Sequence, residues 1–249
     1  MPIVGHEAGG AVTERTSADT RLPTDQQVVI TIDGPAGTGK STVARLLARR
    51  LGLDFLDTGA MYRAAAAITL DHGIDPADSE SVVAKLVSAD LHFDWTTDPP
   101  AMLAWLEPVD DRIREPDVTD LVSVIAANPE VRSHLVRKQR IIAEQHPRLV
   151  TEGRDQGSVV FPNAAVKFYL DAIPEVRAAR RAAQLREAGH EVDEAALVER
   201  IRERDRLDST RSVGPLIIPE GATIIDTSSM SLDRVVDVLC RASRDTVLS

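Results

Sequence analysis

The sequence predicts an α/β fold in which a five-stranded parallel sheet is covered by helices on both faces. Short, almost uniformly apolar segments alternate with segments whose apolar residues recur at helical spacing. This alternation is typical of strands buried on both faces and joined by crossover helices. The first apolar segment also runs into a glycine-rich loop that opens a helix. A chain of 249 residues is long enough for one large α/β domain with insertions.

Taken in order, the chain begins with residues 1–27, which carry scattered charge and show no apolar periodicity. We expect a disordered extension there, and a single folded domain over residues 28–249. The expected core strands cover residues 28–32, 53–56, 149–151, 165–170 and 223–225. The expected helices cover residues 41–50, 58–72, 79–87, 121–126, 129–146, 174–188, 193–206 and 231–243.

Two stretches contain no strand that would extend this sheet, one over about 64–147 and one over about 178–215. We interpret them as inserts on the rim that carries the glycine-rich loop, because α/β proteins bind their ligands there. Residues 91–95 and 101–106 alternate weakly, with a Pro-containing turn between them, and predict a small second sheet in the first insert.

The glycine-rich loop matches G-x-x-x-x-G-K-[ST] in the strand–loop–helix context that gives this motif its meaning. Backbone N–H groups of such a loop converge on phosphate oxygens, and the helix amino end adds partial positive charge. Lys40 would reach the β- and γ-phosphates, and the Ser41 hydroxyl would bind Mg²⁺ directly. A chance match is the alternative, and the flanking strand and helix disfavour it. The predicted ATP-binding residues are Gly34, Pro35, Ala36, Gly37, Thr38, Gly39, Lys40, Ser41 and Thr42.

Polar residues follow the strand expected at 149–151. Glu152 stands where phosphate-loop proteins place an acid that positions Mg²⁺ or its waters, although an ordinary strand-end carboxylate is the alternative. Arg154 and Asp155 should project into the crevice beside the loop, unless they form a surface ion pair. The guanidinium would hold a second phosphate. The carboxylate only accepts hydrogen bonds, so it would select a donor such as an exocyclic amine.

Further anion-binding groups are expected at the same rim. Thr58 and Arg63 flank the amino end of the helix expected at 58–72 and form a second candidate anion site. The segment 177–211 is rich in arginine and acids, which an exposed helix laced with ion pairs would also explain. We favour a mobile, arginine-bearing lid, since phosphoryl transfer depends on positioning and charge neutralisation. Its candidate residues are Arg180, Arg181, Arg204, Asp208 and Arg211.

Composition limits the remaining possibilities. The formal net charge of −10 argues against nucleic acid as a partner, because nucleic-acid binders usually carry a basic face. No apolar run approaches the length of a membrane span, and no signal peptide is visible. Cys240 is the single cysteine and cannot form an internal disulfide, which fits a reducing cytoplasm.

Four motifs together resemble the bacterial cytidylate kinases, a family of nucleoside monophosphate kinases. They are GPAGTGKST at 34–42, LDTGAMYR at 56–63, EGRDQGSVVFP at 152–162 and ERDRLDSTR at 203–211. The resemblance implies ATP-dependent phosphorylation of CMP and dCMP to CDP and dCDP in pyrimidine nucleotide metabolism, with in-line, Mg²⁺-assisted transfer. It also implies the nucleoside monophosphate kinase fold, with the monophosphate-binding insert at about 64–147, the lid at about 178–215, and a monomer.

The resemblance also implies roles for individual residues. Lys40, Arg154, Arg180 and Arg181 would act in catalysis, with the last two approaching the transferring phosphoryl group as lid arginines. Thr58, Arg63, Arg154 and Arg211 would hold the CMP phosphate, Ser123, Arg132 and Asp155 would read cytosine, and Arg204 and Asp208 would contact the sugar.

Physical reasoning agrees with cytosine as the base. Asp155 can accept from the cytosine N4 amine while Ser123 and Arg132 donate to N3 and O2, whereas uracil would set two acceptors face to face. The nearest alternative is a phosphate-loop kinase for adenylate, uridylate, shikimate or gluconate. An ATP-binding switch or a nucleic-acid-associated module is an alternative of another class. The acidic composition and the second anion site count against the latter.

Overall fold

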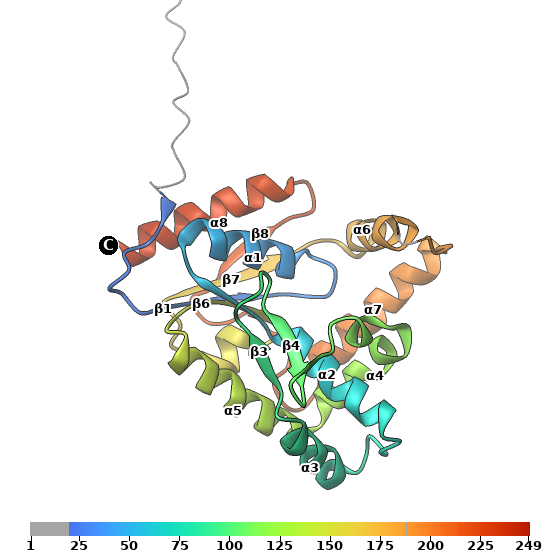
Figure 1. The fold of residues 1–249 in the computed structure, drawn as a ribbon. Coiled ribbons are helices and arrows are strands. Elements are labelled where there is room, and N and C mark those ends of the chain that lie inside the picture. The colour runs from blue at the N-terminus through green and yellow to red at the C-terminus, as the bar shows by residue number, and fades with distance from the viewer. Residues whose placement is uncertain (1–19, 188) are drawn as a thin grey trace, which may run out of the picture.

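A parallel sheet of five strands forms the centre of the molecule in the computed structural model, which describes residues 20–187 and 189–249 (Figure 1). Its strand order is β2-β6-β1-β7-β8, and all four pairings are parallel. The strands are β1 (Val28–Asp33), β2 (Asp54–Asp57), β6 (Arg148–Gly153), β7 (Val166–Asp171) and β8 (Thr223–Asp226). The prediction of a five-stranded parallel α/β sheet is therefore confirmed.

The register of the sheet gathers polar strand ends at one edge. Asp33, at the end of β1, lies opposite Gly153 of β6, and Asp57, at the end of β2, lies opposite Glu152. Since parallel strands all end at the same edge, the loop after β1 and the segments after β2 and β6 meet there. This edge is the place where a ligand site is expected in an open α/β sheet.

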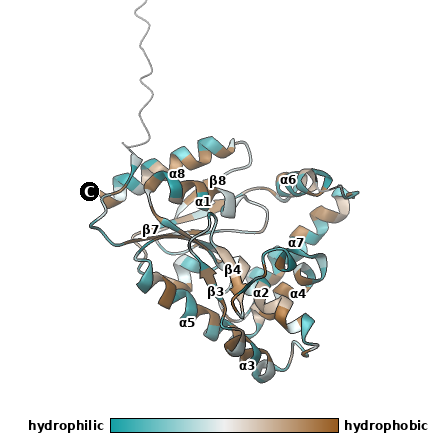
Figure 2. Cartoon of the chain, viewed as in Figure 1, coloured by the Kyte–Doolittle hydropathy of each residue, from teal (hydrophilic) through white to brown (hydrophobic). Residues whose placement is uncertain are grey.

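Helices cover both faces of this sheet (Figure 1). On one face α1 (Lys40–Leu51) and α8 (Leu232–Val247) bury residues such as Leu47 and Leu239 with the strand residue Phe168. On the other face α2 (Thr58–Asp71) and α5 (Pro129–Gln145) belong to a second core cluster. Figure 2 shows the central strands as predominantly hydrophobic, which agrees with strands buried on both faces.

The segment between α2 and α5 forms a lobe that packs on these two helices (Figure 1) and shares their core cluster. It contains α3 (Ser79–Ala89), α4 (Pro116–Ala127) and an antiparallel sheet of β3 (His92–Asp94), β4 (Ala101–Ala104) and β5 (Glu107–Pro108). The small second sheet was expected. Helix α4 begins five residues earlier than the predicted start at 121, because Pro116 occupies its first turn, a position that favours proline.

Two helices project from the sheet beyond β7. They are α6 (Pro174–Glu187) and α7 (Glu194–Thr210), and α7 returns to contact α4 of the insert lobe. Helix α7 continues past the expected end near 206 and stops at Thr210. None of the helices in the described residues is long and apolar enough to span a membrane.

The folded structure begins before the predicted boundary at Val28. Leu22 is only 3% exposed, and its backbone N–H donates to the carbonyl of Leu51 at 3.0 Å. The Arg148 guanidinium donates to the carbonyls of Leu22 and Gln26 at 3.2 and 2.8 Å. The expectation of disorder is therefore wrong for residues 20–27. This segment shows no apolar periodicity, but burial of Leu22 and hydrogen bonds from Arg148 hold it against the domain. The rest of that expectation, residues 1–19, lies outside the described residues.

Candidate active site

The loop between β1 and α1 is shaped by glycine and closed around its own lysine. A Cβ at Gly34 would overlap the backbone carbonyl of Leu170, so only glycine fits there. Lys40 is 5% exposed and donates from Nζ to the carbonyl of Pro35 at 2.8 Å, and Thr38 donates to the same carbonyl at 3.1 Å. Burial, followed by the charge of Arg154, lowers the pKa of Lys40 to about 7. A bound triphosphate would place negative charge beside this buried amine and would raise its pKa again.

Oxygen ligands gather next to this loop. The Ser41 hydroxyl donates to Glu152 Oε1 at 2.8 Å, so the structure brings both predicted metal-site residues together. Asp57 lies beside them, and burial together with the Glu152 charge raises the pKa of its carboxyl group to about 7. Hydroxyl and carboxylate oxygens are the ligands that Mg²⁺ prefers, so this donor set fits that ion.

A residue missed by the sequence analysis, Asp33, fixes the segment that follows β6. Its fully buried carboxylate accepts from the backbone N–H groups of Gln156 and Gly157, each at 2.7 Å. Burial raises the pKa of Asp33 to about 6, and the two hydrogen bonds oppose that rise. Asp33 therefore ties the end of β1 to the turn after Arg154 and Asp155. Its position at the end of the first strand, directly before the glycine-rich loop, is the sequence feature that could have indicated this role.

Arginines converge beyond Glu152. Arg154 donates from Nε to Asp208 Oδ2 at 2.8 Å, which joins the segment after β6 to α7. Arg204 is half-buried, and its buried Nε has no hydrogen-bond partner in the described part of the chain. Burial, followed by the charge of Arg154, lowers the pKa of Arg204 to about 10. Asp208 and Asp205 partly balance this charge, and the free Nε–H together with the neighbouring Arg154 fits an anionic ligand such as a phosphate.

Two further predicted phosphate ligands lie at the amino end of α2. The Thr58 hydroxyl donates to the backbone carbonyl of Glu152 at 2.7 Å, which fastens α2 to β6. Arg63 donates to the Thr119 hydroxyl at 2.9 Å and reaches across to α4. The structure thus places both groups at the same edge of the sheet as Arg154.

The predicted base-reading residues contain a buried ion pair. Arg132 and Asp155 bond through Nη2 and Oδ2, and both side chains are 3% exposed. The Arg132 guanidinium lies 5.4 Å from the centre of the Tyr62 ring, and Arg211 Nη2 lies 4.0 Å from Asp155 Oδ1. Ser123 is half-buried on α4 and makes no hydrogen bond to this pair. Sequence reasoning missed Tyr62, whose buried hydroxyl has no partner among the described residues.

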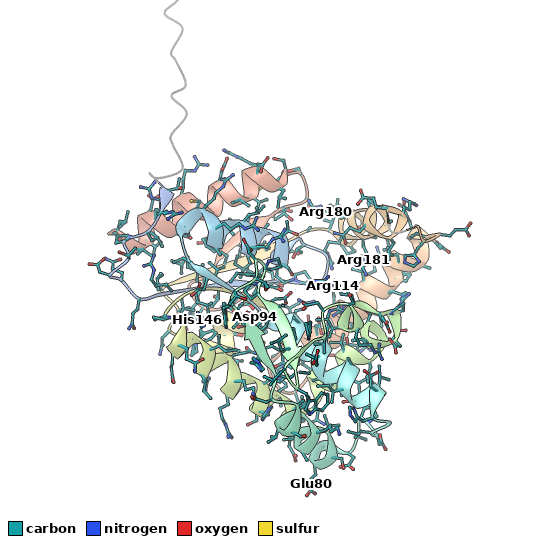
Figure 3. The ribbon with its side chains drawn as sticks, viewed as in Figure 1. Glu80, Asp94, Arg114, His146, Arg180 and Arg181 are labelled. Carbon is teal, nitrogen blue, oxygen red and sulfur yellow. The ribbon has the colours of Figure 1, made fainter. Side chains whose placement is uncertain are left out.

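The two adjacent arginines of α6 point to different surroundings. Arg180 donates to the carbonyl and hydroxyl of Thr227 at 2.6 and 3.1 Å, whereas exposed Arg181 reaches only Gln184 at 3.4 Å. Figure 3 shows both side chains on the α6 side of the molecule. Neither bonds to Lys40 here, so the structure does not assemble these two predicted catalytic residues with the loop.

The strand–loop–helix phosphate site, facing a second cluster of arginines across the sheet edge, defines a P-loop kinase of the nucleoside monophosphate kinase fold. The family model described as cytidylate kinase matches residues 30–245. The chain belongs to this family.

Curated relatives agree with the family match. Cytidylate kinases of Corynebacterium efficiens and Corynebacterium glutamicum are 48% and 47% identical over 214 residues, which is 85% of this chain and 92% of each relative. The cytidylate kinase of Methylococcus capsulatus is 45% identical over 84% of this chain and 94% of its own. A solved gluconokinase from Sinorhizobium meliloti superposes with a TM-score of 0.45 at 16% identity, covering 88% of this chain and 94% of its own.

Proposed function

We propose that the protein transfers the γ-phosphoryl group of ATP to CMP and dCMP, producing CDP and dCDP. Membership of the cytidylate kinase family supports this activity. The observation that carries the choice of acceptor is the buried pair of Arg132, on α5, and Asp155, directly after β6. It offers an arginine donor and a carboxylate acceptor at one place, and cytosine presents the complementary acceptors and amine donor.

ATP would be held by the loop Gly34–Thr42, with Lys40 on the β- and γ-phosphates. Mg²⁺ would bind to Ser41, with Glu152 holding its waters, and would offset charge on the transferring group. Support comes from the hydroxyl–carboxylate contact of 2.8 Å between these two residues. The acceptor oxygen is already an ionised phosphate, so no strong general base is required.

CMP would occupy the opposite side of the sheet edge. Its phosphate would be bound by Thr58, Arg63, Arg154 and Arg211, its sugar by Arg204 and Asp208, and its base by Ser123, Arg132 and Asp155. The buried, unpartnered Nε of Arg204 supports an anionic or polar ligand here. For Arg180 and Arg181 we propose an approach to the phosphoryl group when the lid closes, since catalysis needs charge neutralisation with water excluded.

We further propose a division of the domain into a monophosphate-binding insert at about 64–147 and a lid at about 178–215. The lobe between α2 and α5 and the two projecting helices support this division. The protein would act as a cytoplasmic monomer on free nucleotides and not on nucleic acid. The single cysteine fits a reducing cytoplasm, and the net charge of −10 argues against nucleic acid as a partner. Sedimentation analysis tests the monomer.

An ADP-release assay across acceptors tests the proposed function directly. The panel comprises CMP, dCMP, UMP, AMP, shikimate and gluconate, each with ATP and Mg²⁺. We expect turnover to depend on the acceptor and to be fastest with CMP or dCMP. Preference for any other acceptor would overturn the assignment. ATP binding without acceptor-dependent turnover would indicate a switch protein instead.

A further inference from the structure

Arg177, which none of the site roles above includes, lies at the junction of three parts of the molecule. Its side chain is 3% exposed. Nε donates to the carbonyl of Ala172 at 2.8 Å, and Nη1 donates to the carbonyl of Ala36 at 3.0 Å. Nη1 and Nη2 also bond both carboxylate oxygens of Asp205, at 3.1 and 2.6 Å. All three guanidinium nitrogens therefore have fixed partners, and these partners lie after β7, in the phosphate-binding loop and on α7.

On the loop side the contact is close. Gly37 has a φ of +82°, and a Cβ built there would lie 3.2 Å from Cβ of Arg177. The loop backbone thus packs directly against Arg177. The neighbouring carbonyl of Pro35 is held by Lys40 at 2.8 Å. Two successive loop carbonyls are therefore oriented by two different cations, and Lys40 would have to leave its carbonyl to reach a bound triphosphate.

On the helix side, Asp205 belongs to the same short stretch as the proposed sugar-binding residues Arg204 and Asp208. Helix α7 buries only Ile201 and Asp208, so apolar packing contributes little to its position. Charged contacts hold it instead: Asp205 bonds Arg177, and Asp208 bonds Arg154 at 2.8 Å. Arg177 also bonds the phosphate-binding loop, so the first contact connects α7 to the proposed ATP site. Arg154 is a proposed ligand of the CMP phosphate, so the second contact connects α7 to the proposed acceptor site.

We propose that Arg177 is a positioning residue that couples the ATP site to the acceptor site through Asp205. The inference rests on the proposed function and goes beyond it. A triphosphate that orders the loop favours the Arg177 geometry in which Asp205 and α7 are docked, and a docked α7 presents Arg204 and Asp208 to the acceptor. The coupling is reciprocal, so CMP must strengthen ATP binding by the same factor.

Calorimetry measures this coupling as the ratio of CMP dissociation constants without and with a saturating, non-hydrolysable ATP analogue and Mg²⁺. We expect the analogue to tighten CMP binding by about tenfold in the wild-type protein, within the usual range for coupled sites. In Arg177→Lys or Asp205→Asn this ratio should fall to about two or less, while CMP affinity without the analogue changes by less than about threefold. Arg177 and Asp205 form one contact, so the double variant should lower the ratio no further than either single variant does.

The matched control is the Arg202–Glu175 pair, which also joins α7 to α6. Its contact is 2.6 Å, but both side chains are half exposed and neither touches the loop. Arg202→Lys and Glu175→Gln should therefore keep the wild-type ratio. A purely structural role for Arg177 would lower the thermal midpoint and leave the ratio unchanged, and that result would overturn the proposal.

A wild-type ratio near one would also overturn the proposal, as would a loss of coupling in the control variants. Asp205 is 23% exposed, so Asp205→Asn removes the negative charge and one of the two acceptor oxygens without emptying a buried position. Absence of CMP binding in the wild-type protein would contradict the proposed function itself and the coupling with it. Normal CMP-dependent ADP release with an unchanged ratio in the variants would contradict the coupling alone.

Discussion

At the scale of single residues, this protein buries charge where a ligand or a backbone group faces it. Removing a carboxylate or a guanidinium from water costs several kcal/mol unless partners compensate. Asp33 is compensated by two backbone N–H groups, and Arg132 and Asp155 compensate each other. Arg204 lacks a partner on Nε among the described residues. The Asp33 contacts hold the segment after β6 in place. For Arg132, Asp155 and Arg204 we propose that the acceptor nucleotide supplies further partners.

Asp155→Asn tests base reading. An amide can donate as well as accept, so the variant should no longer exclude the O4 acceptor of uracil. An unpaired buried polar group costs about 1–3 kcal/mol, and the ratio of kcat/KM for CMP over UMP should therefore fall by about tenfold or more. Asp120→Asn, in an exposed pair with Arg200, is the control and should keep the wild-type ratio. An unchanged ratio in Asp155→Asn would remove this residue from base reading.

Asp33→Asn tests the buried carboxyl group through pH. The pKa of Asp33 is 3.8 when unfolded and about 6 when folded, so between these values the folded state binds more protons. The contribution of Asp33 to the free energy of unfolding must then fall as pH rises through this window, by about 3 kcal/mol in total. The variant lacks this dependence. Urea titrations give the free energy of unfolding of the variant minus that of the wild type at each pH. This difference should be larger at pH 7 than at pH 4, by up to about 3 kcal/mol. A pH-independent difference would contradict the shifted pKa.

At the scale of elements, the segment after α7 packs against the buried Arg132–Asp155 pair. Gly214 has a φ of +57°, and a Cβ there would overlap the Arg132 guanidinium. The Arg211 Nε donates to the Gly214 carbonyl, so the turn is fixed beside Asp155. The turn after α7 therefore packs against the Arg132–Asp155 pair, where we propose that the acceptor binds. The periodicity of α7 alone indicates only an exposed helix rich in ion pairs.

Gly214→Ala tests this arrangement. The new Cβ would displace Arg132, so KM for CMP should rise by roughly tenfold to a hundredfold, as expected for misplaced binding groups. Gly221→Ala is the matched control, since Gly221 has a φ of +74° and nothing within 4 Å of a built Cβ. Both variants carry similar backbone strain, but only the first should change KM. Equal kinetic effects in steady-state assays would show that strain alone is responsible.

At the scale of the whole molecule, the core continues beyond the segments that periodicity marks. Leu22 packs with Val28, Leu51 and Leu53 in the cluster between the sheet and α1. Arg148, at the start of β6, holds the preceding backbone through carbonyl contacts. These contacts lie at the amino ends of the strands, opposite the edge that carries the site. They should therefore affect stability and leave catalysis unchanged.

Leu22→Ala should lower the free energy of unfolding by about 2–3 kcal/mol, in the range for a buried leucine. Denaturant titration measures this, and the kinetic constants for CMP should stay at wild-type values. Leu106→Ala is the control, because Leu106 is 75% exposed and should cost little. A loss below that of the control would mean that the 20–27 segment does not contribute to the core.

The strand–helix alternation, the parallel sheet, the phosphate-binding loop and the motifs of the proposed acceptor site are all predictable from the sequence. These features follow from short-range patterns, since a strand or a glycine turn is specified by neighbouring residues. Which distant groups meet depends on the tertiary structure. Arg177 and Ala36 are 141 positions apart, and Arg154 and Asp208 are 54 apart. Leu22, Asp33 and Arg177 carry no periodic signal, because their roles depend on packing between elements. The loop can therefore be recognised in the sequence, but its link to α7 can be recognised only in the fold.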